Sequence, residues 1–306
     1  MIEYQQKIGE LIARIRNQRG LTQKELADKL KTSQSAINRI EAGKQNVTLE
    51  MLARISDVLN KEIISLGSDS VNLRVEGGHK LRGSIDTKVS KNATVGLLCA
   101  ALLNRGTTTL KKVPKIEEVF RLIEVLQSIG VKVTWLDDGD VEIKPPKVLK
   151  LEDIDAKAAR RTRSIIMYLG PLMHRYKEFR LPYAGGCKLG KRTVAPHLYA
   201  LEEFGLSVDT KNNYYHVTVR KKSPKEVTLY EMGETVSENV LMAAAMTEGT
   251  TIIRNISSNY MVQDMCFFLE KLGARIEGIG TNTLTVHGVK DVEKNITYAP
   301  SEDPIE

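Results

Sequence analysis

The segment VFRLIEVLQSIGVKV, residues 119–133, shows the plan on which most of this chain is built. Apolar residues recur with helical spacing up to Ile129, Gly130 follows, and the alternation at 131–133 is typical of a β-strand. A second short strand pattern, residues 141–143, comes after a turn. The segment therefore predicts a helix that a glycine closes, followed by two strands.

The same plan occurs twice more. The second copy has a helical pattern at 198–204, then Gly205, then strand patterns at 206–208 and 217–219. The third copy has a helical pattern at 262–272, then Gly273, then strand patterns at 274–276 and 284–286. The three glycines lie about seventy residues apart, which is too long for a thin solenoid. We expect a threefold pseudo-symmetric α/β domain in which each glycine caps a helix and has no ligand-binding role.

The first 66 residues follow another pattern, with short amphipathic helices, small turns and almost no strand signal. Thr22 and Glu25 can form a capping box for a helix that runs to about Leu30. Ser33 can cap the next helix. Its inward residues are Ala36, Ile37 and Ile40, and its outward residues are Gln34, Ser35, Asn38 and Arg39.

Two stretches of this module, LTQKELA at 21–27 and SAINRIEAG at 35–43, resemble the phage-repressor helix-turn-helix family. In that family the second helix lies in the major groove of DNA. The resemblance implies base contacts for Gln34, Ser35 and Asn38, and backbone contacts for Gln23, Arg39 and Lys44. It also implies a homodimer on paired half-sites. A helical module of the same fold that binds protein is the alternative.

A small polar break at residues 67–70 separates this module from the strand-like alternation that begins at residue 71. We therefore expect a DNA-binding domain at 1–66, a linker at 67–70 and a second region at 71–306.

Composition indicates a soluble chain with anionic partners. It has 306 residues, 42% of them hydrophobic, and a formal charge of +7 with a pI near 9.1. The three cysteines show no metal-ligand spacing, and no signal peptide or membrane-spanning apolar run is visible. We expect a cytoplasmic protein without a metal site, in which Cys99 and Cys266 lie in the core.

Cys187 has a different setting, because it lies in the loop GGCKLGKR, residues 185–192. Neighbouring cations favour a thiolate, and glycines allow backbone amides to approach an anion. The loop indicates an anion site with a reactive thiol; a surface turn with an incidental cysteine is the alternative.

From residue 71 onward the chain resembles the enolpyruvyl transferase family. The motifs are SKNA at 90–93, RSII at 163–166 with LGPL at 169–172, the cysteine loop, and EGTTII at 248–253. The resemblance implies an α/β inside-out barrel domain of three repeats. It also implies transfer of an enolpyruvyl group from phosphoenolpyruvate to UDP-N-acetylglucosamine, in peptidoglycan precursor synthesis, without a cofactor.

The resemblance also implies roles for individual residues. Lys91, Arg163 and Arg192 would hold the phosphate and carboxylate groups, and Asn92 would contact substrate. Cys187 would protonate or capture phosphoenolpyruvate and would react with fosfomycin. Asp303 would be the base toward the sugar hydroxyl. His197 matches a family histidine, with a packed helix-start residue as the alternative. For Lys91, Arg163 and Asp303 the alternative is a solvated surface charge.

The chain departs from the family pattern in length and at a few positions. The family has two such domains facing a cleft, so we expect one complete domain at 91–295, with strands at 71–90 and 296–306 that belong to a largely missing partner domain. The differing positions are Ala195 for an aspartate, Glu231 for a lysine, Gly233-Glu234-Thr235 for Ser-Val-Gly, and Pro304 for an arginine.

Three functions remain open on this basis. The first is an enolpyruvyl transferase fused to a DNA-binding module. The second is a transcriptional regulator whose transferase-like domain senses phosphoenolpyruvate or a UDP-sugar, and the third is a scaffold.

Overall fold

The computed structural model of the chain describes residues 2–59, 78, 80, 82–185, 193–220 and 222–305. The chain divides into two compact units, Met1–Arg82 and Gly83–Glu306, and we describe each by itself. The linker predicted at residues 67–70 lies outside the described residues. No helix among the described residues is both long and apolar enough to cross a membrane.

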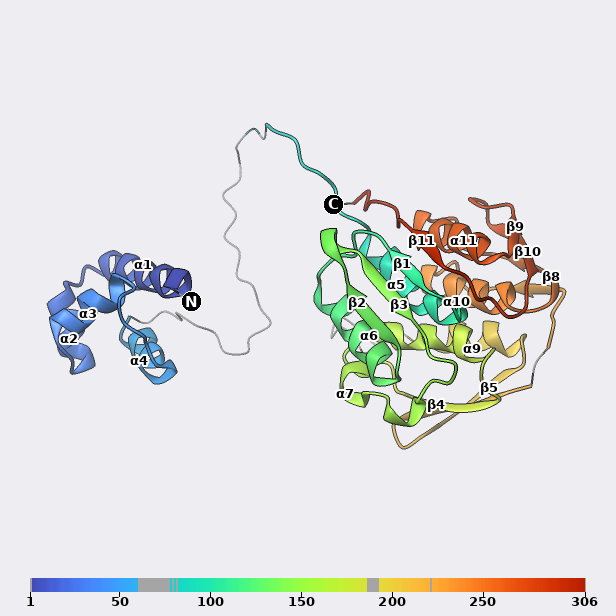
Figure 1. The fold of residues 1–306 in the computed structure, drawn as a ribbon, viewed down its shortest axis with the longest axis horizontal. Helices are drawn as coiled ribbons and strands as arrows, with labels where there is room; N and C mark the ends of the chain where they lie inside the picture. Colours follow the sequence, from blue (N-terminus) through green and yellow to red (C-terminus); the bar gives the residue numbers. More distant parts are fainter. Residues whose placement is uncertain are drawn as a thin grey trace. The chain divides into compact units, whose positions relative to one another are not determined.

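The first unit contains four helices in its described part, as Figure 1 shows: α1 (Ile2–Gln18), α2 (Gln23–Leu30), α3 (Gln34–Glu41) and α4 (Leu49–Leu59). Both predicted caps are present. Thr22 and Glu25 form the capping box of α2, and the Ser33 side chain accepts a hydrogen bond from the amide of Ala36 in α3. The predicted inward residues Ala36, Ile37 and Ile40 are buried. Ile37 and Ile40 share a core with Ile12, Leu26 and Ile55.

The described part of the second unit contains three sheets. The first has the order β11-β1-β3-β2, with β1 (Thr108–Leu110), β2 (Lys132–Trp135), β3 (Val141–Lys144) and β11 (Ile296–Tyr298). The second has the order β4-β6-β5, with β4 (Glu178–Pro182), β5 (Leu206–Lys211) and β6 (Tyr214–Val219). The third has the order β7-β8-β10-β9, with β7 (Glu226–Thr228), β8 (Gly249–Arg254), β9 (Arg275–Glu277) and β10 (Thr283–Gly288).

Each sheet contains the two strands of one predicted repeat, and the helix of that repeat precedes them in the chain. The helices are α6 (Glu117–Ser128), α9 (Ala195–Glu202) and α11 (Tyr260–Leu272), and each precedes two antiparallel strands. Gly130, Gly205 and Gly273 follow these helices with φ of 90°, 88° and 120°. Gly205 is the most constrained, because a Cβ there would lie 1.7 Å from the carbonyl oxygen of Arg220. The predicted helix-closing glycines are thus confirmed.

Buried helices occupy the middle of this unit: α5 (Lys91–Ala100), α10 (Glu234–Ala245), and a 3₁₀ segment η4 (Arg163–Tyr168) that continues into α8 (Leu169–Leu172). Figure 1 shows α5 and α10 in the interior with the sheets on different sides. Cys99 on α5 and Cys266 on α11 are buried in this core, as the sequence predicts, and burial raises the pKa of the Cys99 thiol. The remaining short elements are η1 (Ala101–Leu103), η2 (Asp137–Gly139), η3 (Leu151–Asp153) and α7 (Ala156–Ala159).

The two outer segments differ from expectation. The sequence assigned residues after 296 to a partner domain, but β11 pairs in parallel with β1 and so completes the first sheet of this unit. Residues 82–88 contain no strand, and Val89 forms an isolated antiparallel bridge with Glu302. The strand predicted at 71–75 lies outside the described residues.

Candidate functional site

Two of the predicted site residues begin the buried helices. Ser90 caps α5, so Lys91 and Asn92 are its first residues, and Thr162 caps η4, so Arg163 is its first residue. Asn92 is exposed. Because helix starts carry unpaired amide groups and a partial positive charge, cations placed there create a setting for an anionic ligand.

Glu118, on α6, joins these two helix starts. Its carboxylate accepts from Lys91 Nζ over 2.8 Å, from Ser164 Oγ over 2.7 Å and from Thr162 Oγ1 over 3.3 Å. Burial acts to raise the pKa of Glu118, but the hydrogen bonds from Lys91, Ser164 and Thr162 and the Lys91 charge together lower it. Glu118 is therefore ionised at neutral pH and fixes Lys91 relative to η4.

The cysteine loop is attached to this region at both of its described ends. At one end a Cβ on Gly185 would lie 1.4 Å from the carbonyl oxygen of Arg160, so only glycine fits that contact. At the other end the carbonyl oxygen of Thr193 accepts from Arg163 Nη2 over 2.9 Å. Cys187 and Arg192 themselves lie outside the described residues. Gly185 and Thr193 thus both lie against residues 160–163.

His197 lies next to Arg163 but has the geometry of a packed residue, the alternative that the sequence left open. It is 2% exposed, its Nδ1 accepts from Asn239 Nδ2 over 3.2 Å, and its Nε2 lies 3.3 Å from Thr235 Oγ1. Asn239 also donates to the carbonyl of Ile166 and accepts from the amide of Gly170. His197 therefore ties α9 to α10 and, through Asn239, to η4 and α8.

This burial predicts a dependence of stability on pH. Burial, and then the Arg163 charge, lower the pKa of His197 from 6.5 to about 4. The unfolded chain therefore binds the proton more readily than the folded chain between these values, and stability falls as the pH falls through them. We expect His197 to account for a loss of about 3 kcal/mol in the free energy of unfolding between about pH 7 and pH 4.

Denaturant titrations of the protein and of His197→Asn would measure this difference. The asparagine variant, which cannot titrate, should lose less stability over that interval. An equal loss in both proteins would contradict the assignment.

Asp303 lies beside the start of α5. The Tyr260 hydroxyl is 3.0 Å from Ser90 Oγ and 3.4 Å from Asp303 Oδ1, and the Asp303 amide donates to the carbonyl of Lys88 over 2.8 Å. Nearby, the buried carboxylate of Asp264 accepts from the amide of Ser301 over 2.8 Å. The structure thus holds the end of the chain that carries Asp303 against the helix that carries Lys91.

Glu231 and residues 233–235, which differ from the family pattern, lie at the start of α10. Gly233 caps this helix, and a Cβ there would lie 3.0 Å from Glu231 Oε1, so the Glu231 carboxylate is directly beside the helix start. Glu234 adds a second carboxylate in the first turn. This helix start is therefore acidic, in contrast to those of α5 and η4.

On the first unit the predicted DNA-contact residues lie mostly on the surface. Gln34, Ser35, Asn38 and Arg39 are exposed on α3, and Lys44 is exposed after it. Gln23 is half-buried, and its Nε2 donates to Glu41 Oε2 over 2.9 Å. The exposed face of α3 therefore has the side chains that a base-reading helix needs.

Sequence patterns missed the partners that link these residues, above all Glu118 and Tyr260. Glu118 is one of two acidic residues at the start of a helix. Acidic residues there normally stabilise the helix through its dipole and do not indicate a binding site. Within the described part of the chain, no group of three His, Cys, Asp or Glu side chains could hold a metal ion.

Comparison with known proteins agrees with this geometry. Residues 75–306 match the EPSP synthase (3-phosphoshikimate 1-carboxyvinyltransferase) family, and residues 12–66 match the helix-turn-helix family. The UDP-N-acetylglucosamine 1-carboxyvinyltransferase of Bradyrhizobium diazoefficiens is 38% identical over 232 residues, which are 76% of this chain and 53% of that protein. The protein of the same name from Treponema denticola is 36% identical over 216 residues, 71% of this chain and 50% of its own length.

A solved structure shows the same fold. The enolpyruvyl transferase NikO from Streptomyces tendae superposes with a TM-score of 0.64 at 21% identity, over 74% of this chain and 53% of that one. The chain spans about half the length of the curated relatives it matches. Because the family match covers most of its residues, the chain belongs to the EPSP synthase (3-phosphoshikimate 1-carboxyvinyltransferase) family.

Proposed function

We propose that the protein transfers the enolpyruvyl group of phosphoenolpyruvate to a UDP-amino sugar, with UDP-N-acetylglucosamine as the first candidate, and that its first unit binds DNA. The observation that carries the enzymatic part is that Glu118 links the two helix starts that carry Lys91 and Arg163, because its carboxylate accepts from Lys91 and from Ser164, the residue after Arg163. This arrangement suits a small anion with a phosphate at one end and a carboxylate at the other.

The chemistry needs an acid, a base and cationic groups. Protonation of the methylene carbon of phosphoenolpyruvate gives a cationic centre, which the sugar hydroxyl attacks as it loses its proton. The resulting tetrahedral ketal expels phosphate and loses a proton from its new methyl group, which gives the enol ether. Lys91 and Arg163, with Arg192, would bind the phosphate and carboxylate oxygens. Cys187 would supply the proton or capture the substrate, and Asp303 would accept the hydroxyl proton.

Lys91 is paired with Glu118, so an incoming anion would compete with this carboxylate. The Lys91 side chain is 45% exposed and that of Glu118 is 30% exposed, so the pair is accessible to a ligand. Asn92 is exposed next to Lys91 and would contact substrate. His197 would act through Arg163 and α10, because both of its ring nitrogens already have protein partners.

The part of the chain that would meet the diphosphate of the acceptor departs from the family, because Glu231 and Glu234 place carboxylates at the start of α10. Carboxylates repel a diphosphate, whereas the lysine of the family attracts it. A panel of UDP-sugars is therefore the appropriate set of acceptors.

A regulator that senses metabolites is the second candidate function. The exposed face of α3 and the match of residues 12–66 to the helix-turn-helix family favour it. We propose that the first unit binds DNA as a homodimer, with base contacts from Gln34, Ser35 and Asn38 and phosphate contacts from Gln23, Arg39 and Lys44.

Product analysis separates these two functions. The protein would be incubated with phosphoenolpyruvate and each UDP-sugar, and the enol ether would be sought by mass spectrometry. Formation of the ether supports the transferase. DNA affinity that changes on addition of either metabolite, with no ether formed, supports the regulator instead.

A further inference from the structure

The Tyr260 hydroxyl joins two segments that lie far apart in the chain. It is 3.0 Å from Ser90 Oγ, 170 residues earlier, and 3.4 Å from Asp303 Oδ1, 43 residues later. Tyr260 is the first residue of α11, and Ser90 caps α5 directly before Lys91. The phenol therefore links the start of the helix that carries Lys91 to the carboxylate proposed as the base.

The backbone around Asp303 is held without the help of Tyr260. The Ser90 amide donates to the carbonyl of Ser301 over 2.9 Å. The Asp303 amide donates to the carbonyl of Lys88 over 2.8 Å. These two bonds fix the path of the chain on both sides of residue 302, so the phenol of Tyr260 acts on the Asp303 side chain alone.

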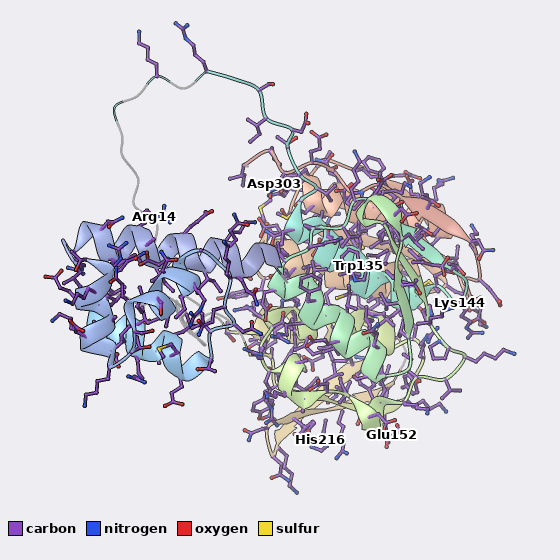
Figure 2. The ribbon with its side chains drawn as sticks, turned by 60° about the vertical axis from the view of Figure 1, so that its left-hand side comes forward. Arg14, Trp135, Lys144, Glu152, His216 and Asp303 are labelled. Carbon is purple, nitrogen blue, oxygen red and sulfur yellow. The ribbon has the colours of Figure 1, made fainter. Side chains whose placement is uncertain are left out.

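The Asp303 carboxylate is bound through one of its two oxygens. Oδ1 accepts from the Ile305 amide over 2.9 Å and from the Tyr260 hydroxyl over 3.4 Å. Among the residues that the structure describes, none donates a hydrogen bond to Oδ2. Asp303 is half-buried, and Figure 2 shows it at the edge of the second unit opposite His216. One oxygen is thus held, while the other is left to accept a proton.

The chemistry of the three groups sets the direction of these hydrogen bonds. A carboxylate only accepts, so Tyr260 must donate to an ionised Asp303. The phenol has a single proton, so its oxygen accepts in turn from the Ser90 hydroxyl. Ser90 Oγ also accepts from the amide of Ala93 over 3.3 Å. The result is a chain of donors that starts at the cap of α5 and ends at Asp303 Oδ1.

We propose that Tyr260 is a positioning residue for enolpyruvyl transfer, which holds Asp303 Oδ1 so that Oδ2 can face the sugar hydroxyl. This inference rests on the proposed function. In this step the hydroxyl proton passes to Oδ2, while the hydroxyl oxygen forms its bond to the central carbon of protonated phosphoenolpyruvate. Oδ1 still accepts after Oδ2 is protonated, so the bond from Tyr260 is kept throughout. Such positioning removes rotational freedom from the base before the reaction.

Tyr260→Phe tests this proposal, because it removes the hydroxyl and keeps the ring. Ser90 keeps its bond from the Ala93 amide, and α11 keeps its cap, the Asn259 side chain. We expect kcat for phosphate release to fall roughly 10–100-fold, while KM for phosphoenolpyruvate stays the same. A structural disturbance at the start of α5 would instead raise that KM, because Lys91 follows Ser90 directly.

A double-mutant cycle with Asp303→Asn shows whether Tyr260 acts through Asp303. Asp303→Asn alone should lower the rate by about 10²–10⁴-fold, the usual contribution of a general base. Tyr260→Phe should then cost little or nothing in the Asp303→Asn protein, because no base is left to position. The same cost in both backgrounds would mean that the effect does not pass through Asp303, and it would overturn the proposal.

Tyr298→Phe is the matched control. The Tyr298 hydroxyl, on β11, donates to Asp264 Oδ1 over 2.7 Å, and both residues are buried. Asp264 lies on α11, as Tyr260 does, so the same atom is removed from a second tyrosine–aspartate pair on one helix. Because this pair is the more buried, Tyr298→Phe should lower the melting temperature more than Tyr260→Phe and leave kcat close to its unaltered value. An equal loss of kcat in the two variants would contradict the role of Tyr260.

Three other results would also count against this role of Tyr260. An unchanged kcat in Tyr260→Phe would overturn the inference alone. An unchanged rate in Asp303→Asn would overturn the role of Asp303 together with the inference, while leaving the proposed transfer in place. Absence of phosphate release by the unaltered protein would overturn the proposed function and the inference together.

Discussion

Lys91→Ala should lower the rate of enolpyruvyl transfer by about 10²–10³-fold, the loss typical of removing one charge-stabilising donor from a reacting oxyanion. Lys91 is the first residue of α5, where its ammonium group and the helix start act on the same anion. Glu118 would be left without the 2.8 Å partner that it has now, so the carboxylate would also repel phosphoenolpyruvate. Steady-state kinetics with both substrates would measure the loss.

Lys111 offers a matched control for this experiment. Its side chain is 47% exposed, against 45% for Lys91, and it too forms an ion pair with a carboxylate, that of Asp140. Lys111 lies just after β1 and belongs to neither of the helix starts that form the site. Lys111→Ala should therefore leave the rate close to that of the unaltered protein. Similar losses in the two variants would mean that Lys91 has no special role.

Arg16→Ala should unfold the helix-turn-helix unit or leave it marginally stable. Arg16 on α1 is 8% exposed and binds Glu41 at the end of α3 through two bonds, of 2.6 Å and 2.9 Å. It also donates to the carbonyl of Leu21 over 2.7 Å, before α2. Removing one partner of such a pair leaves a buried charge and costs about 3–5 kcal/mol, which is most of the stability of a unit this small. Thermal unfolding followed by circular dichroism would show the loss.

Arg39→Ala is the control that separates folding from DNA contact. Arg39 is exposed on α3, and its Nε donates to Gln45 Oε1 over 3.0 Å. We expect this variant to keep the melting temperature of the first unit and to bind DNA more weakly. A first unit as stable with Arg16→Ala as with Arg39→Ala would contradict the role given to the Arg16–Glu41 pair.

Local signals predicted the elements that local interactions form. The caps at Thr22 and Ser33 act within four residues, so the sequence placed the starts of α2 and α3 correctly. The same holds for Gly273, which has left-handed φ at the end of α11. These features depend on backbone groups a few residues away, and a single sequence contains that information.

Long-range pairing could not be predicted in the same way. The sequence assigned residues after 296 to another domain, whereas β11 pairs with β1, which lies nearly two hundred residues earlier. The prediction was wrong because the sequence of a short apolar strand does not specify which strand it pairs with. Glu118 is 27 residues from Lys91, and only the packing of α6 beside α5 brings them together. The motif identified His197 as a candidate site residue, but it did not show that the side chain is buried and that both ring nitrogens have protein partners.

The measurement that tests the central claim most directly is the release of inorganic phosphate from phosphoenolpyruvate by the purified protein, with and without UDP-N-acetylglucosamine and other UDP-amino sugars. We predict release that requires both substrates and is lost in Lys91→Ala. Absence of phosphate release with every UDP-amino sugar would contradict the proposed enolpyruvyl transfer.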